Sequence, residues 1–522
     1  VNNNLTPRAF VSPTKVSVIG NSTPVSLTVY NAGLNTVTSF RVDWIVNGVA
    51  QTYYPWTGSL SPKSTVTINL GTFTPVADEN TLLVYTSLPN GQADAVPTND
   101  TLGFITKGCD SLLHGTYIVN HDTALADILD KLLNCGISGP VTIQLASGTY
   151  SHFMLTNEII GSDTDKTVTF TSLAANPDSV VFFTSNYYQP VLTLKTNHVK
   201  FDKITFDGTL NQYYVVNFSG SSTNVEFYGC KILSDTANSY YDAVPVYKGY
   251  NTGEAKNLRF IKNLINGGYY GIYLYSGSGK NLISNSFIID SNIIQNQAYN
   301  GLYFDQSNLI SLSYNTILSR NTNASYDWYG INSWSTKYNL LYANKIYQRS
   351  NDINYSYGIY AYYSNHSDFT NDTGFVANNE IVLTSNSSSY GIYCPYSKLR
   401  IYHNSVYIGG YGSAYGITLD GDNPIDLRNN IFVTPSWTYP IRVYNSSMPL
   451  FADYNNYYAD ATNIGEYNYN SITSISAWRT ATGQDAHSVS ATATFEFSDT
   501  AFLGLSSTSG FYCPVLTRVS KD

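Results

Sequence analysis

Charged side chains are scarce in this 522-residue chain and make up 12% of it. Lys and Arg number 27 against 36 Asp and Glu, a net charge of −9, and the basic residues form no cluster. Nucleic-acid binding needs clustered Lys and Arg to neutralise phosphates, so nucleic acid is excluded as a partner. No apolar run approaches the roughly 18 residues of a membrane-spanning helix, so we expect no membrane span.

Sequence motifs for common chemistries are also missing. None of the five cysteines forms a Cys-x-x-Cys pair, and no Cys/His group has the spacing of a zinc site. The seven histidines share no spacing, and the Gly-x-Ser-x-Gly, Walker A and His-Glu-x-x-His motifs do not occur. The sequence therefore predicts no catalytic residue, no metal ligand and no cofactor.

Aromatic residues, by contrast, are abundant. Tyrosine alone contributes 47 residues, aromatics reach 15%, and hydrophobic residues reach 43%. Such a chain is too apolar to remain disordered. The composition predicts a folded, β-rich, weakly charged extracellular protein.

Residues 1–105 contain short alternating segments separated by turn residues. The clearest segments are 25–30, 40–46, 66–70 and 82–86. Asn47-Gly48 follows the second segment, and this pair is typical of a type I′ hairpin turn. Several short strands within about 100 residues predict an immunoglobulin-like β-sandwich for residues 1–105.

One amphipathic helix is predicted near residues 124–133. Its apolar residues fall on a single stripe at helical spacing: Leu125, Ile128, Leu129, Leu132 and Leu133. From Val141 onward the chain reads as strands. We expect the helix to cap the open N-terminal end of those strands, covering edges that would otherwise recruit other chains.

The strand region contains an internal repeat. A Gly or Pro followed by an aliphatic residue recurs every 24 to 33 residues, at Gly271, Gly301, Gly330, Gly358, Gly391, Gly416 and Pro440. A second series interleaves with it, at Asn263, Asn292, Asn315, Asn344, Asn379, Asn404 and Asn430. Each unit is too short to bury its own apolar face, so neighbouring units must stack.

The columns after each Gly predict the sides of the strand. Positions +1 and +3 are mainly apolar and share one face at period two, so they point inward, while +2 and +4 point outward. We expect the Asn column to lie inside a bend, with amides bonded from rung to rung. The predicted fold is all-β: the sandwich, then a right-handed parallel β-helix of about ten rungs over residues 106–522, capped by the short α-helix.

These columns also predict the cysteine chemistry. Cys109 and Cys135 flank the helix 26 residues apart, whereas Cys230 replaces Asn in its series and Cys394 is in an inward column. We therefore predict a Cys109–Cys135 disulfide, with Cys230 and Cys394 as buried thiols.

Several stretches resemble known families. Residues 139–150 are similar to the opening of right-handed β-helix domains in secreted bacterial surface proteins, which share the fold of the pectate-lyase-like superfamily. Residues 25–33 and 44–48 resemble CARDB modules, named for bacterial cell-adhesion proteins. The combination resembles large surface proteins exported by type IX secretion. This resemblance implies a secreted or cell-surface bacterial location and a role in adhesion.

An enzyme of the β-helix type would need clustered acids and bases on one outer face. The +4 column holds Asp305 and Asp420, four rungs or about 19 Å apart. Paired glycosidase carboxylates lie roughly 5–9.5 Å apart, so these two do not form such a pair. Arg442 is the only cation in the two outward columns.

The outward columns are instead rich in aromatic residues. The six candidate ligand-binding residues are Tyr273, Tyr275, Tyr303, Trp334, Tyr360 and Tyr362. Ring faces stack on sugars and hydroxyls bond to them, so such a wall suits a glycan or surface ligand. The competing interpretation is that outward tyrosines only shield the sheet, since tyrosine favours strands.

The sequence thus favours a non-enzymatic extracellular surface or adhesion protein that binds glycans through an aromatic outer face. One alternative is a polysaccharide lyase or glycoside hydrolase. Another is a structural subunit of a surface layer or filament that self-associates through its Tyr-rich faces.

Overall fold

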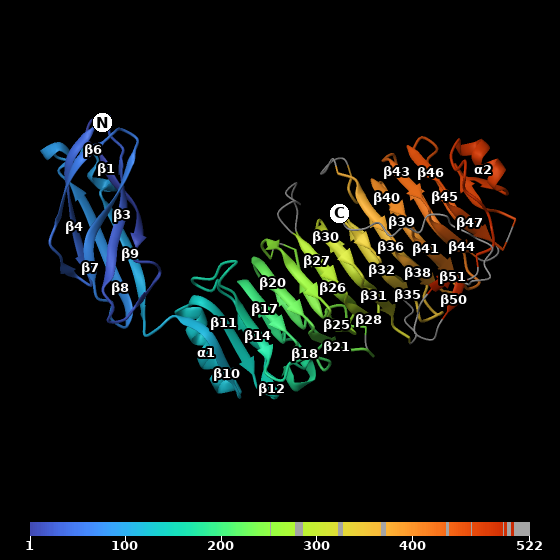
Figure 1. Cartoon of the computed structure of the whole chain (residues 1–522), viewed down its shortest axis with the longest axis horizontal. Helices are drawn as coiled ribbons and strands as arrows, with labels where there is room; N and C mark the ends of the chain where they lie inside the picture. Colours follow the sequence, from blue (N-terminus) through green and yellow to red (C-terminus); the bar gives the residue numbers. More distant parts are fainter. Residues whose placement is uncertain are drawn as a thin grey trace. The chain divides into compact units, whose positions relative to one another are not determined.

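The computed structural model describes residues 1–237, 239–250, 252–276, 286–321, 327–366, 372–434, 438–460, 462–493, 495–497 and 503–505. The chain forms two compact units (Figure 1). The first contains residues 1–116, 123–141 and 159–167. The second contains residues 117–122, 142–158 and 168–522.

The first unit contains a β-sandwich of two sheets. One sheet has the order β1 (Leu5–Ser12), β3 (Thr23–Asn31), β7 (Thr65–Phe73). The other has the order β2 (Val16–Val18), β9 (Thr101–Cys109), β8 (Asp78–Ser87), β4 (Val37–Val46), β5 (Val49–Ala50), with β6 (Tyr54–Leu60) also on β4. Two 3₁₀ turns, η1 (Pro89–Gly91) and η2 (Pro97–Asn99), precede β9.

Alternation buries one side of each sandwich strand. The core includes Leu27, Val42, Trp44 and Val84. The predicted hairpin is present, because Val46 pairs with Val49 across Asn47-Gly48 and both turn residues have positive φ, 48° and 78°. The sandwich expected from the alternating segments is therefore confirmed.

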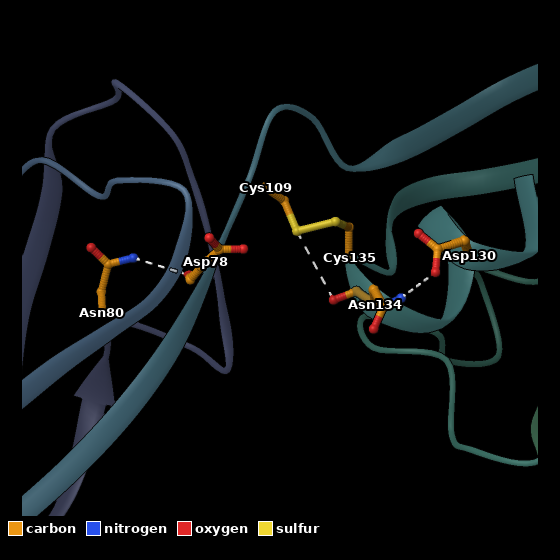
Figure 2. Close-up of a disulfide and its surroundings, with 6 residues drawn as sticks. All are labelled: Asp78, Asn80, Cys109, Asp130, Asn134 and Cys135. Carbon is orange, nitrogen blue, oxygen red and sulfur yellow. Dashed lines mark hydrogen bonds between the residues drawn. A yellow bond between two sulfur atoms is a disulfide. The ribbon is translucent and has the colours of Figure 1, made fainter. Parts of the chain in front are cut away.

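The predicted helix forms α1 (Asp122–Asn134), between β10 (Leu113–Val119) and β11 (Ile137–Leu145). Leu125 and Leu132 of the apolar stripe are buried. Cys109, at the end of β9, is bonded to Cys135, which directly follows α1 (Figure 2). The predicted disulfide is thus present, and Cys230 and Cys394 are buried free thiols.

Most of the remaining described residues form a parallel β-solenoid with three sheets (Figure 1). Sheet 1 has the order β10, β11, β14 (Val168–Ser172), β17 (Asn197–Asp202), β20 (Ser222–Tyr228), β24 (Leu258–Ile261), β27 (Phe287–Asp290), β30 (Asn308–Ser313), β34 (Leu341–Tyr342), β37 (Gly374–Ala377), β40 (Leu399–Tyr402), β43 (Ile425–Arg428), β46 (Leu450–Asp453). Off this path, β23 (Ala255–Lys256) pairs with β20 and β33 (Lys337–Tyr338) with β30.

Sheet 2 has twelve strands, one for each turn of the solenoid. They are β12 (Gly148–Ser151), β15 (Val180–Phe183), β18 (Thr205–Gly208), β21 (Lys231–Ser234), β25 (Leu264–Asn266), β28 (Ile293–Gln297), β31 (Thr316–Ser319), β35 (Lys345–Tyr347), β38 (Glu380–Leu383), β41 (Ser405–Ile408), β44 (Ile431–Thr434) and β47 (Asn456–Ala459). Within the described residues the solenoid thus has about two more turns than the repeat spacing predicts.

Sheet 3 completes each turn. Its strands are β13 (Phe153–Leu155), β16 (Leu192–Leu194), β19 (Val216–Phe218), β22 (Val246–Lys248), β26 (Tyr270–Tyr275), β29 (Asn300–Asp305), β32 (Trp328–Trp334), β36 (Tyr355–Tyr362), β39 (Ser388–Pro395), β42 (Ala414–Asp420), β45 (Tyr439–Val443), β48 (Gly465–Tyr467) and β49 (Asn470–Ile472). The other elements are η3 (Pro177–Ser179), α2 (Ile475–Thr482), β50 (Phe495–Phe497) and β51 (Leu503–Leu505).

The Asn series forms a hydrogen-bonded ladder at the corner between sheets 1 and 2. Its members are Asn263, Asn292, Asn315, Asn344, Asn379, Asn404, Asn430 and Asn455, all buried. In each rung the backbone N–H and the side-chain amide donate to the Oδ1 of the next Asn, at 2.9–3.1 Å. The predicted rung-to-rung bonding is confirmed and extends to Asn455.

A left-handed residue precedes each ladder Asn. Lys262, Tyr314 and His403, for example, all have φ of 57°. This backbone turns the chain between the two sheets and aims the Asn side chain inward. In the earlier turns Cys230 stands at this corner, and phenylalanines fill the interior, with Phe201 and Phe227 stacked at 4.9 Å. Those turns lack the Asn and Gly signals, which is why the spacing predicts too few rungs.

The Gly column is explained by the close approach of neighbouring strands within the solenoid. A Cβ on Gly330 would lie 2.3 Å from Cγ2 of Ile346 on sheet 2 and 2.8 Å from the carbonyl oxygen of Gly358. The +1 and +3 columns that follow are buried, as predicted, including polar Ser333 and Cys394. The +2 and +4 columns consequently face outward on sheet 3.

Lys248 occupies an inward position of sheet 3 and is fully buried. Its ammonium donates to the Tyr275 carbonyl at 3.3 Å and to Thr252 Oγ1 at 3.4 Å. These neutral acceptors do not replace the lost hydration, so burial lowers the pKa of Lys248 to about 8.

We expect Asn344→Ala to destabilise the solenoid by about 3–5 kcal/mol, because two donors of Asn315 lose their buried acceptor. Chemical denaturation measures the loss. Asn386→Ala, at an exposed position, is the matched control and should change little. Equal stability of the two variants would show that the ladder contributes nothing.

Reduction of the Cys109–Cys135 disulfide is expected to lower stability by about 2–4 kcal/mol, since the bond restricts the unfolded chain. Thermal unfolding with and without reductant measures it. In a Cys109→Ser/Cys135→Ser variant the reductant should have no further effect. Burial raises the pKa of Cys230 to about 12, so this thiol should resist alkylation until the protein unfolds.

Lys248→Met should stabilise the protein at about pH 7, because at that pH the Lys248 amine is charged in the folded protein and burying this charge costs free energy. The folded-state pKa lies below the ordinary value of 10.5, so the unfolded chain holds the proton more tightly. The wild-type penalty is therefore complete below about pH 8 and fades as the pH rises toward 10.5. Thermal midpoints of both proteins across this range test it, with exposed Lys15→Met as control.

Candidate functional site: the aromatic outer face of sheet 3

The outer face of sheet 3 carries three parallel rows of side chains. The leading row, one residue before each Gly, contains Tyr270, Asn300, Tyr329, Tyr357, Tyr390, Tyr415 and Tyr439. The middle row, two residues after each Gly, contains Tyr273, Tyr303, Asn332, Tyr360, Tyr393, Thr418 and Arg442, together with Tyr247, which pairs with Tyr273. The trailing row, four residues after each Gly, contains Tyr275, Asp305, Trp334, Tyr362, Pro395 and Asp420.

The six candidate residues all lie on this face. Tyr273, Tyr303 and Tyr360 belong to the middle row, and Tyr275, Trp334 and Tyr362 to the trailing row. Strand register places Tyr273 beside Tyr303 and Trp334 beside Tyr362. The structure thus brings the candidates together on four consecutive strands, β26, β29, β32 and β36.

The leading row was missed by the sequence reasoning. Tyr357 lies between Tyr329 and Tyr390, with ring centroids 4.5 and 4.9 Å away and nearly parallel planes. The stack continues to Tyr415 at 4.9 Å. A Tyr or Asn directly precedes every repeat glycine, but strict period-two alternation would place this position inward with the +1 and +3 columns.

Rings in register stack on one another along the solenoid. The middle row runs from Tyr247 to Tyr273 at 5.2 Å and on to Tyr303 at 4.7 Å, and Tyr214, which lies outside the row, stacks on Tyr247 at 3.6 Å. Rungs repeat at about 4.8 Å, so equivalent rings meet face to face. Within a stack the ring faces are therefore covered, and the ring edges and hydroxyl groups are exposed to solvent.

Burial among other rings raises the pKa of these tyrosines. It raises the pKa of Tyr360 to about 12, and that of Tyr303 further. The hydroxyls therefore stay protonated at neutral pH and can donate as well as accept hydrogen bonds.

The middle stack is interrupted at Asn332. Trp334 Nε1 donates to Asn332 Oδ1 at 3.1 Å, and the indole is tilted against Tyr362 at 4.6 Å and Tyr360 at 5.9 Å. The Trp334 side chain remains 38% exposed, whereas Asn332 is buried beneath it. Trp334 is thus the member of the six that presents most ring surface to a flat ligand.

Two carboxylates lie on the trailing row. Asp305 is flanked by Tyr275 and Trp334 on the neighbouring strands. Burial raises its pKa to about 6, although a hydrogen bond from Tyr303 acts in the opposite direction. Asp420 lies four strands further on, about 19 Å away, which is beyond the roughly 5–9.5 Å of a glycosidase pair.

Arg442, the cation of the middle row, is already paired. Its Nε donates to Glu466 at 2.8 Å, and its guanidinium packs over Tyr415 at 4.3 Å and Tyr444 at 4.6 Å. A lyase needs a cation or metal to hold the negative charge that develops after proton abstraction. Arg442 is not placed for that task beside either carboxylate.

Among the described residues, no group of three or more His, Cys, Asp or Glu side chains is arranged to hold a metal ion. In the same part of the chain, no helix has both the length and the apolar character to cross a membrane.

Comparison with known proteins finds no matching family model and no matching curated protein. Among solved structures, a CARDB domain from Pyrococcus furiosus, in complex with di-metal ions, is 19% identical with a TM-score of 0.18. The match covers 21% of this chain and 90% of that one. A domain of a candidate cell surface protein from Methanosarcina acetivorans is 23% identical with a TM-score of 0.19, covering 22% and 98%.

A candidate β-galactosidase from Bacteroides fragilis is also similar, at 10% identity and a TM-score of 0.16. That match covers 56% of this chain and 47% of the other, so this chain spans about half of that protein. The fold assignment therefore rests on the strand pairing described above, and no activity is taken from these likenesses.

Proposed function

We propose that this protein is a non-enzymatic extracellular surface protein that binds a glycan, or a glycan-bearing surface, through the outer face of sheet 3. The observation that carries the proposal is the set of aromatic rows with Trp334 exposed at their centre. Hydroxyl and amide groups beside a ring surface are the combination that sugars require.

The arrangement of charges supports binding over catalysis. Asp305 and Asp420 are too far apart to act on one glycosidic bond, and Arg442 is held by Glu466. An adhesion module needs no such pair of carboxylates, because its binding depends on the contact area with the ligand.

An extracellular location is supported by the Cys109–Cys135 disulfide, since such bonds persist in oxidising compartments. We further propose a bacterial cell-surface location, export by a type IX system, a CARDB-type sandwich and a solenoid of the pectate-lyase-like superfamily. These finer assignments rest on residues 25–33, 44–48 and 139–150.

Replacing Trp334 by Ala should weaken glycan binding roughly tenfold without unfolding the solenoid, because its indole is the exposed platform. A triple variant that also replaces Tyr303 and Tyr360 should lose binding further. Glycan-array screening followed by titration calorimetry measures both, with circular dichroism to verify the fold.

Tyr411→Ala is the matched control, because that tyrosine is 97% exposed but lies outside the three rows. Unchanged binding in the triple variant would assign the rings to shielding of the sheet. Release of reducing or unsaturated ends from a pectic, alginate or neutral glycan would instead establish the protein as a hydrolase or lyase.

A further inference from the structure

Asp305 is a carboxylate set among aromatic rings. It ends β29, and strand register places Tyr275 on one side and Trp334 on the other, about 4.8 Å away at the backbone. Tyr303 of the same strand hydrogen-bonds to its carboxyl group. The charge of Asp305 also raises the pKa of Tyr273, Tyr275 and Tyr303, so all three rings lie close to it.

This carboxylate has no cationic partner within the described residues. The groups that face it from β26 and β29 are tyrosines, and those on β32 are Asn332 and Trp334. Some other acids on the solenoid surface have cationic partners, as Glu226 has in Lys200 and Arg259. A desolvated acid without a counter-charge is costly, so its position calls for a ligand that supplies one.

The rings around Asp305 favour the same kind of ligand. The faces of Trp and Tyr carry negative potential and attract ammonium groups, most strongly where water is displaced. Trp334 remains partly exposed beside the carboxylate, so a ligand can reach both. A carboxylate and aromatic rings together provide charge and desolvated contact to a protonated amine.

We propose that Asp305, Tyr275 and Trp334 form a subsite for the protonated amino group of a glycan, so that the face selects a polymer containing unacetylated amino sugars. This inference rests on the proposed glycan binding. A linear polymer fits because the rows repeat rung after rung.

Two probes with the same sugar backbone test the subsite: short glucosamine oligomers and their N-acetylated counterparts. We expect the wild-type protein to bind the glucosamine oligomer roughly tenfold more tightly, since only it carries ammonium groups. Asp305→Asn should abolish that preference while leaving the N-acetylated oligomer bound as before. Asp420→Asn, which removes a second carboxylate of the row, is the matched control and should largely keep it.

The dependence on pH gives a second readout. Ionisation of Asp305 with a pKa of about 6 should strengthen glucosamine binding as the pH rises from about 5 to about 6, while the amine of the oligomer is still protonated, and the Asp305→Asn protein should lack this rise. An ordinary aspartate would be ionised throughout that range.

Each outcome separates the two levels of the proposal. Equal affinity for both oligomers, or a preference that survives Asp305→Asn, would overturn the amine subsite and leave glycan binding intact. Binding of neither oligomer, nor of any other glycan on the array, would overturn the proposed function itself. Capture of lysine-rich protein in place of both sugars would identify a protein surface as the source of the ammonium group.

Discussion

The asparagine ladder is the interaction on which the rest of the solenoid depends. Each ladder Asn satisfies two donors of the preceding rung and donates to a sheet 1 carbonyl, as Asn344 does to Leu312 at 2.8 Å. A shift by one residue would turn the amide outward and leave several buried polar groups without partners. The ladder therefore holds successive turns in one register.

Register at the corner determines the chemistry of the outer face. Turns held in step place equivalent residues of sheet 3 directly above one another, so the tyrosines stack into rows. The same stacking covers most ring faces, so open ring surface is left where a row is interrupted. Asn332 and Asp305 are such interruptions, and the partly exposed Trp334 lies beside both.

Much of this architecture could be predicted from sequence because equivalent residues recur in each column over several turns. The buried columns and the Asn ladder follow from the repeat spacing and period-two alternation, and α1 follows from its apolar stripe at helical spacing, with the two cysteines that flank it forming the disulfide. The early turns could not be counted, since phenylalanine packing such as Phe201 on Phe227 leaves no regular motif. Period-two alternation places a residue on a face but does not show how rings orient or which acid lacks a cationic partner, so the environment of Asp305 is visible only in the folded structure.

The structure of the C-terminal end was not predicted, because Trp478 and Asp485 belong to no repeated column of the sequence. There α2 begins at its N-cap Ser474 and buries Trp478, whose Nε1 donates to Asp485 at 2.8 Å. The Asp485 carboxylate also accepts a hydrogen bond from the side-chain amide of Asn455, the last ladder residue, at 3.2 Å.

Every amide in the ladder points the same way, with its oxygen toward the preceding rung and one of its N–H groups donated to the next Asn. The aligned dipoles give the array a polarity, and the positive end is the C-terminal one. Asp485 lies at that end and complements it, much as an acidic side chain does at the start of a helix. A carboxylate accepts hydrogen bonds but has no N–H to pass on. The chain thus terminates its internal amide array chemically as well as sterically.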